Sequence, residues 1–154
     1  MQHRRRVLLA SVLLAAAILS SVVRAAGSEG AERLYLSGHD RADAVAWDFR
    51  CSSGAKAREW AKLPVPSNWE MHGFGTLSYH STEPCEVGEY RHVFAVPAGW
   101  ADRRVFLVFD GAMTDTTARL NGAPVGPTHR GGFYRFQYEV TGLVRTGAEN
   151  TLEV

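Results

Sequence analysis

The sequence predicts an all-β chain that folds as an antiparallel β-sandwich or jelly roll, preceded by a signal-peptide helix. First, residues 134–140 alternate strictly between apolar and polar side chains, as in a strand with one buried face. Second, Asn121-Gly122 favours a two-residue hairpin turn, because both turn positions need positive φ. Third, residues 26–154 show no helical stripe, and short strand patterns lie between glycine, proline and asparagine residues. An antiparallel sheet therefore fits better than a parallel βαβ sheet.

The first 25 residues have the features of a secretory signal peptide. Arg4-Arg5-Arg6 supplies the positive charge, residues 7–23 are mostly apolar, and Ala25 ends a small-residue cleavage pattern. We expect cleavage after Ala25, or else after Ala26, with export to the periplasm or the extracellular space. An uncleaved anchor is the alternative, although the apolar run is slightly short for a spanning helix. Residues 26–33 are typical of a flexible leader, and no membrane contact is expected after cleavage.

The predicted β domain covers residues 34–154, and its first strands are short. Residues 34–36 are apolar. Trp47 and Phe49 are two positions apart, so they can share one face of a strand. Residues 54–59 then indicate a polar turn.

Clearer strand patterns follow in the second half of the domain. Residues 90–96 alternate until Pro97 ends the ladder. Residues 105–109 are a continuous apolar run that is too short for a helix, which predicts a buried strand. Residues 116–120 lead directly into the Asn-Gly turn, and residues 141–144 fit a short helical turn.

The sequence stops inside an apolar strand. Leu152 and Val154 share a strand face and are expected to lie in the core. We therefore expect this chain to be the N-terminal piece of a longer protein, with its last strand cut off. An unpaired edge left by such a cut predicts poor solubility of the isolated piece.

Composition and motif content exclude several classes of function. The chain has 17 basic and 16 acidic side chains, and three of the basic ones lie in the expected signal peptide, so no nucleic-acid partner is expected. The histidines lack metal-ligand spacing, and neither a Gly-x-Ser-x-Gly elbow nor a phosphate loop occurs. No metal or cofactor is therefore expected. Acidic residues fall in turns or on outward strand faces, including Asp110, Asp115, Glu139 and Glu149.

Two cysteines, Cys51 and Cys85, would reach an oxidising compartment after export. A disulfide between them is one expectation, and two separate buried thiols are the other. Neither cysteine has the Cys-x-x-Cys spacing of a redox or metal site.

Five motifs follow one another along residues 45–154, and together they resemble the N-terminal sugar-binding domain of glycoside hydrolase family 2, the family of β-galactosidases, β-glucuronidases and β-mannosidases. The motifs are residues 63–75 with Pro-Ser-Asn-Trp, 88–91, 104–111, 120–122 with 125–126, and 147–152. The resemblance implies a galactose-binding-like jelly roll that buttresses a later catalytic barrel, whose two glutamates lie outside this chain. It therefore implies an accessory domain of an exported hydrolase of β-glycosides, with no catalytic residue of its own.

The resemblance also implies a sugar contact in the loop after the tryptophan motif. In the β-galactosidases this loop lends an asparagine to the sugar pocket. Here Ser81 occupies that position, flanked by Tyr79, His80 and Thr82, and its shorter side chain favours a different sugar or a different loop. The alternative is a plain surface loop. Trp69 is interpreted as a structural residue, because such aromatic side chains are more often buried than ligand-bound.

Two other functions remain open on the residues alone. A stand-alone carbohydrate-binding module would stack sugars on exposed aromatic residues such as Tyr79, Trp100 or Tyr134. Tyr134 alternates with core residues, which predicts burial for it. A purely structural domain would instead provide an interaction surface for its own barrel or for another subunit, and fold alone does not choose among these functions.

Overall fold

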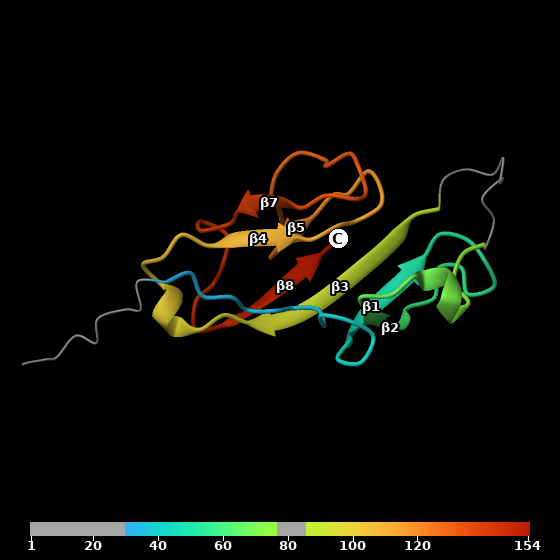
Figure 1. Ribbon diagram of the computed structural model, residues 1–154, viewed down its shortest axis with the longest axis horizontal. Helices are drawn as coiled ribbons and strands as arrows, with labels where there is room; N and C mark the ends of the chain where they lie inside the picture. Colours follow the sequence, from blue (N-terminus) through green and yellow to red (C-terminus); the bar gives the residue numbers. More distant parts are fainter. Residues whose placement is uncertain (1–29, 77–85) are drawn as a thin grey trace, which may run out of the picture. The chain divides into compact units, whose positions relative to one another are not determined.

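The computed structural model describes residues 30–76 and 86–154, and all of its strands lie within Arg33–Val154 (Figure 1). All pairs between the named strands are antiparallel, which confirms the predicted fold class. The predicted signal peptide lies outside the described residues. Among the described residues, no helix has the length and apolar character to cross a membrane. The elements are β1 (Val45–Cys51), β2 (Ala61–Val65), η1 (Trp69–His72), β3 (Gly88–Ala95), η2 (Ala98–Trp100), β4 (Phe106–Phe109), β5 (Arg119–Leu120), β6 (Ala123–Pro124), β7 (Phe136–Glu139) and β8 (Glu149–Glu153).

Six strands form the larger sheet, in the order β2-β1-β3-β8-β5-β6, and β4 pairs with β7 in a second sheet. The strand β8 lies inside the larger sheet, between β3 and β5. Its Leu152 is opposite His92 on one side and Leu120 on the other. Leu152 is 1% exposed, so the predicted core position is confirmed.

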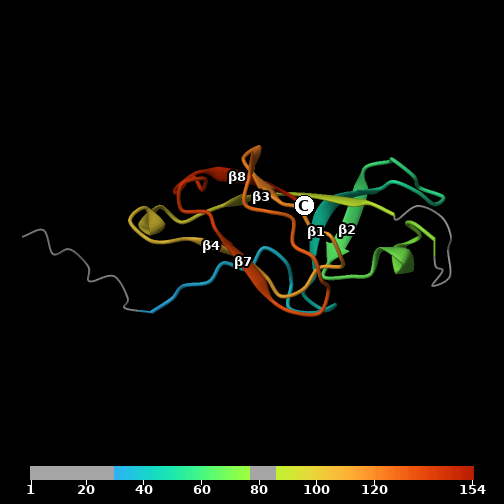
Figure 2. The ribbon, with the colours of Figure 1, turned by 90° about the horizontal axis from the view of Figure 1, so that it is seen from above.

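The two sheets pack face to face over part of the larger sheet (Figure 2). Leu107 and Phe109 of β4 pack against a buried cluster made by Trp47, Ala118 and Leu152. Apolar side chains of this kind contribute about 1.5–3 kcal/mol each when they are fully buried. The sandwich is therefore held mainly by the inward faces of β1, β8 and β4.

The remaining part of the larger sheet is covered by η1 instead of a strand. Phe49 is completely buried, and the Trp69 ring stacks on it with ring centroids 5.5 Å apart. Phe74, just after η1, packs against the Phe49 ring in an edge-to-face arrangement, with ring centroids 4.9 Å apart. Trp69 thus has the packing role that the sequence indicates. Gly88 lies beside this stack, where an added Cβ would come within 2.2 Å of Trp69 Cζ3.

Replacing Gly88 by alanine is expected to lower the free energy of unfolding by about 1–3 kcal/mol, because the new methyl group overlaps the Trp69 ring. Urea denaturation followed by circular dichroism measures the change. The matched control is Gly99→Ala, since nothing lies within 4 Å of a Cβ at Gly99. Equal stability of the two variants would contradict this packing.

The predicted Asn-Gly turn is present. Asn121 and Gly122 have φ values of 54° and 82°, and they join β5 to β6 with Leu120 opposite Ala123. Both positive φ values are those that a two-residue hairpin requires. The prediction at these two residues is confirmed.

Two burial predictions are wrong. The sequence predicts a buried strand over residues 105–109, but Phe106 is 39% and Val108 46% exposed. Their strand lies in the two-stranded sheet, and only the face with Leu107 and Phe109 packs on the larger sheet. Tyr134 was expected in the core but is exposed, because β7 begins only at Phe136.

Residues 34–36 form no strand, although they are apolar. Leu36 packs beside the Trp47 cluster, and the indole Nε1 of Trp47 donates a 3.0 Å hydrogen bond to its carbonyl oxygen. The segment is therefore a covering stretch of chain and not a member of either sheet.

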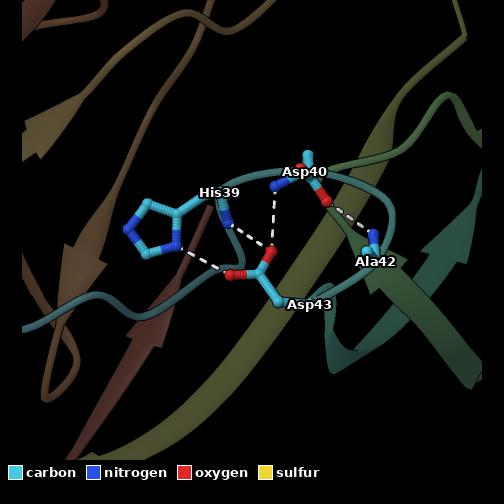
Figure 3. A network of polar contacts seen from close by, with 4 residues as sticks. All are labelled: His39, Asp40, Ala42 and Asp43. Carbon is cyan, nitrogen blue, oxygen red and sulfur yellow. Dashed lines mark hydrogen bonds and ion pairs between the residues drawn. The ribbon is translucent and has the colours of Figure 1, made fainter.

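The loop that precedes β1 is organised around the carboxylate of Asp43 (Figure 3). It accepts hydrogen bonds from the backbone N–H groups of His39 and Asp40, at 2.7 and 2.9 Å, and its other oxygen is 2.7 Å from Nδ1 of His39. These contacts, led by the Asp40 backbone bond, lower the pKa of Asp43 to about 2. The carboxylate therefore stays charged in mildly acidic solution.

Acid is expected to open this loop only at very low pH. Because the pKa of Asp43 is about 2 in the folded chain, against an ordinary 3.8, the contribution of Asp43 to stability is present above pH 3.8 and is lost as the pH falls toward 2. The titration of the Asp43 side-chain carbon in NMR spectra measures its pKa directly. A midpoint at 3.8 would show that the network does not form in solution.

Candidate functional site

The predicted sugar-loop residues Tyr79, His80 and Ser81 lie outside the described residues, so their role stays a prediction. Cys85 also lies outside them. Cys51 is buried at the end of β1, and the Cys51–Cys85 disulfide likewise stays a prediction.

The chain on either side of residues 77–85 is held by the loop that connects β1 to β2. Gly75 forms a β-bridge with Gly54 on the one side. On the other side, Ser53 Oγ donates a 2.6 Å hydrogen bond to the Glu86 carboxylate. The backbone N–H of Val87 then donates to Ser52 Oγ at 2.8 Å. The β1–β2 loop and the start of β3 therefore border residues 77–85.

A pocket of about 230 Å³ lies at this place. It is lined by residues from the end of β1, from the β1–β2 loop and from the start of β3. Arg50 of β1 is directly opposite Glu89 of β3, so the strand register brings two of the lining residues together. The lining residues are Arg50, Cys51, Ser52, Arg58 and Glu89.

The backbone of Arg58 is fixed in an unusual conformation. Its φ is 65°, in the left-handed region that side chains other than glycine and asparagine rarely adopt. Its backbone N–H donates a 2.7 Å hydrogen bond to the carbonyl oxygen of Cys51, which holds this conformation. Among the described residues, no carboxylate forms an ion pair with the Arg58 guanidinium. Arg58 therefore brings an unneutralised positive charge to the pocket.

Arg50 connects the pocket to an aromatic side chain. One of its terminal nitrogens, Nη2, lies 2.6 Å from the Glu89 carboxylate. Its guanidinium also lies 4.8 Å from the centre of the Trp60 ring, and that of Arg91 lies 4.7 Å from the same ring. Trp60 itself is 41% exposed.

The neighbouring outer face of the larger sheet carries alternating charges. Lys62 lies 2.6 Å from Asp48, and Arg91 lies 3.5 Å from Glu153. Asp48 is also opposite Arg91, and Glu153 is opposite Arg119. These side chains form a row of alternating charges that crosses β2, β1, β3, β8 and β5. Each charge in this row has an opposite charge beside it. The pocket differs, because its lining includes two arginines and only one acidic residue.

The pocket lacks the pair of carboxylates that glycoside hydrolysis uses, and the described residues include no cluster of the metal-binding kind. Glu89 is the one carboxylate that lines the pocket, whereas glycoside hydrolysis uses two. No described group of His, Cys, Asp or Glu side chains has the geometry of a metal site. The acidic residues predicted to face outward are exposed, and Asp110, Asp115 and Glu139 pair with Arg135, Arg130 and Arg104 respectively.

Two titratable groups inside the sandwich are shifted by their surroundings. Burial raises the pKa of Tyr90 to about 12, so its phenol stays neutral. Burial also lowers the pKa of His92, whose ring stacks on Trp47 with centroids 4.7 Å apart. Both groups therefore serve as packing residues at neutral pH.

Sequence reasoning missed Arg50, Arg58 and Trp60. The alternation of Trp47 and Phe49 in β1 places Arg50 on the outward face, so the outward position of Arg50 could have been predicted from the sequence. The left-handed backbone at Arg58 and the closeness of Trp60 to two arginines depend on strand pairing and carry no local signature. Of the aromatics predicted as possible sugar platforms, Trp100 packs partly buried against the core, and Tyr134 is exposed.

The two antiparallel sheets place the chain in the class of β-sandwich domains, with a pocket where the β1–β2 loop meets the start of β3. Within this class, the family model described as "Glycosyl hydrolase 2 galactose-binding domain-like" matches residues 86–154. Residues 86–154 are therefore similar to this family. The matched segment begins just before β3 and includes all later strands.

The relatives are glycosidases several times longer than this chain. A β-glucuronidase of Bacteroides fragilis is 28% identical over 110 residues, which are 70% of this chain and 15% of the relative. A β-galactosidase of Bacteroides ovatus is 27% identical over 132 residues, which are 77% of this chain and 15% of the relative. The solved β-D-glucuronidase of Dictyoglomus thermophilum matches with a TM-score of 0.55 and 26% identity, covering 71% of this chain and 18% of that one.

Proposed function

We propose that this chain is the accessory sugar-binding domain of a glycoside hydrolase that cleaves O-glycosidic bonds of β-glycosides. The observation that carries the proposal is the family match over residues 86–154, together with relatives named β-glucuronidase and β-galactosidase. The chain spans about 15% of the length of these two relatives. The catalytic carboxylates belong, in this proposal, to a barrel domain downstream, and the partners are that domain and a β-glycoside.

Exposed apolar side chains support packing of the domain on further polypeptide. Phe106 and Val108 cover the outer face of β4, and Met113 follows that strand. Phe133 and Tyr134 precede β7, and Phe133 is 91% exposed. Large exposed apolar side chains on neighbouring segments are typical of interaction surfaces.

The test is to express a longer polypeptide, encoded by this gene together with the DNA downstream of codon 154. We expect it to cleave a p-nitrophenyl β-glucuronide or β-galactoside, and we expect glutamine substitution of either barrel glutamate to abolish this activity. The chain alone is expected to be inactive on the same substrates. A longer, folded polypeptide that cleaves no aryl β-glycoside would overturn the proposal.

Export is part of the same proposal, supported by the charged and apolar pattern of residues 1–25. Expression in a bacterial host followed by cell fractionation and N-terminal sequencing tests it. A mature N-terminus at Ala26 or Gly27 in the periplasmic or extracellular fraction is the expected result. Retention of Met1 in the cytosolic fraction would contradict export.

A further inference from the structure

We propose that the Arg50–Arg58 pocket binds the carboxylate of an acidic sugar, with the Trp60 ring beside it as a platform for the sugar ring. This inference rests on the proposed function and names the class of sugar that the domain takes. It concerns binding by the described residues only and assigns no chemical step to them.

The charge of the pocket selects an anion. Two arginines and one glutamate are among its lining residues, which gives these residues a net charge of +1. Glu89 is already 2.6 Å from Arg50, whereas no described carboxylate pairs with Arg58. Guanidinium groups bind carboxylates through paired hydrogen bonds, and such charge-assisted bonds are about twice as strong as neutral ones. Arg58 is therefore the anchoring residue of the proposed site.

The position of Arg58 is set before any ligand arrives. Its left-handed backbone and the 2.7 Å bond to Cys51 fix the point where its side chain leaves the loop. A non-glycine residue held in this conformation is strained, and such residues cluster at ligand sites. Ser52 also lines the pocket, and its hydroxyl, which accepts a hydrogen bond from the Val87 N–H, keeps its own proton to donate.

Trp60 makes a sugar a better occupant than a simple inorganic anion. Its ring is 41% exposed and lies within 5 Å of the Arg50 guanidinium that lines the pocket. The guanidinium groups of Arg50 and Arg91 lie over this ring, and the exposed part of the indole offers an apolar surface beside them. A ligand that combines a carboxylate with a ring bearing C–H groups meets both features.

The experiment is an NMR titration of the purified chain with sodium D-glucuronate at neutral pH and low salt. We expect saturable shifts of the Trp60 indole N–H and of the backbone amides of Ser52 and Arg58. D-Glucose tests the need for the carboxylate, and sodium acetate tests the need for the ring. Both are expected to bind at least about ten-fold more weakly, because each lacks one of the two contacts.

Two substitutions test the pocket itself. Arg58→Asn removes the charge while asparagine tolerates positive φ, so the loop is kept and affinity is expected to fall about ten-fold. Glu89→Gln removes the competing carboxylate and is expected to raise affinity several-fold. The matched control is Arg41→Asn, at an exposed arginine in the loop before β1, which is expected to leave affinity unchanged.

Several outcomes would overturn the proposal. These are equal binding of glucose and glucuronate, equal binding of acetate and glucuronate, shifts confined to other residues, or full affinity in a folded Arg58→Asn variant. The titration measures binding without hydrolysis, so its failure leaves the proposed glycosidase function to be judged on the aryl glycosides. Conversely, the chain could bind glucuronate while the longer polypeptide cleaves no aryl glycoside. That result would support the proposed binding pocket and contradict the proposed glycosidase function.

Discussion

Replacing Asn150 by leucine is expected to lower the free energy of unfolding by at least about 3 kcal/mol, because several buried polar groups lose their partner at once. Asn150 is 1% exposed. Its Oδ1 accepts hydrogen bonds from the Arg145 backbone N–H at 2.8 Å and from Asn121 Nδ2 at 2.9 Å. Its Nδ2 donates to the carbonyl oxygens of Arg145 and Ala148. A leucine of similar size satisfies none of these groups.

The same asparagine links two of the motifs on which the resemblance to glycoside hydrolase family 2 rests. Asn121 lies in the hairpin turn, and its Oδ1 accepts a 3.0 Å hydrogen bond from the Thr151 backbone N–H. Urea denaturation of Asn150→Leu beside Glu149→Ala, at the exposed neighbour, measures the effect. The control is expected to change stability by no more than about 0.5 kcal/mol. Similar midpoints for both variants would show that the network contributes little.

Replacing Phe49 by alanine is expected to cost about 3–5 kcal/mol, the usual range for a buried phenylalanine. Its side chain is completely buried and contacts the rings of Trp69, Phe74 and Tyr90. The substitution leaves a cavity between the larger sheet and η1 that these neighbours fill only in part.

Phe133→Ala is the matched control for Phe49→Ala. Phe133 is 91% exposed, so the same chemical change removes little buried surface and is expected to shift stability by less than about 0.5 kcal/mol. Chemical denaturation of both variants gives the comparison directly. A loss at Phe133 as large as that at Phe49 would place the core elsewhere.

The parts of the fold that depend on local chemistry could be predicted from the sequence. The Asn121-Gly122 turn requires two positive φ values, and few residue pairs supply them. The alternation of Trp47 and Phe49 identified the buried face of β1 correctly. Exposure of Val108 could not be predicted, because a short apolar run does not reveal whether one or both faces of its sheet are covered.

The candidate site was less predictable than the fold. The resemblance directed attention to residues 79–81, while the pocket arises from the cross-strand pairing of Arg50 with Glu89 and from the backbone at Arg58. Strand order and register are set by long-range pairing, which the period of side chains along one strand does not encode. Single arginines on polar loops also carry no spacing that would distinguish them from solvated surface residues.

The interior position of β8 has a consequence for synthesis on the ribosome. Strands β1, β2 and β3 can pair once residue 95 has emerged, but the second edge of β3 has no partner until residues 149–153 follow. The hairpin of β5 and β6 likewise waits for β8 before it joins the sheet. During that interval the nascent chain exposes strand edges that can pair with other chains. Completion of the sheet is thus a late, long-range event, and a pause in translation before residue 149 would lengthen the period of vulnerability to aggregation.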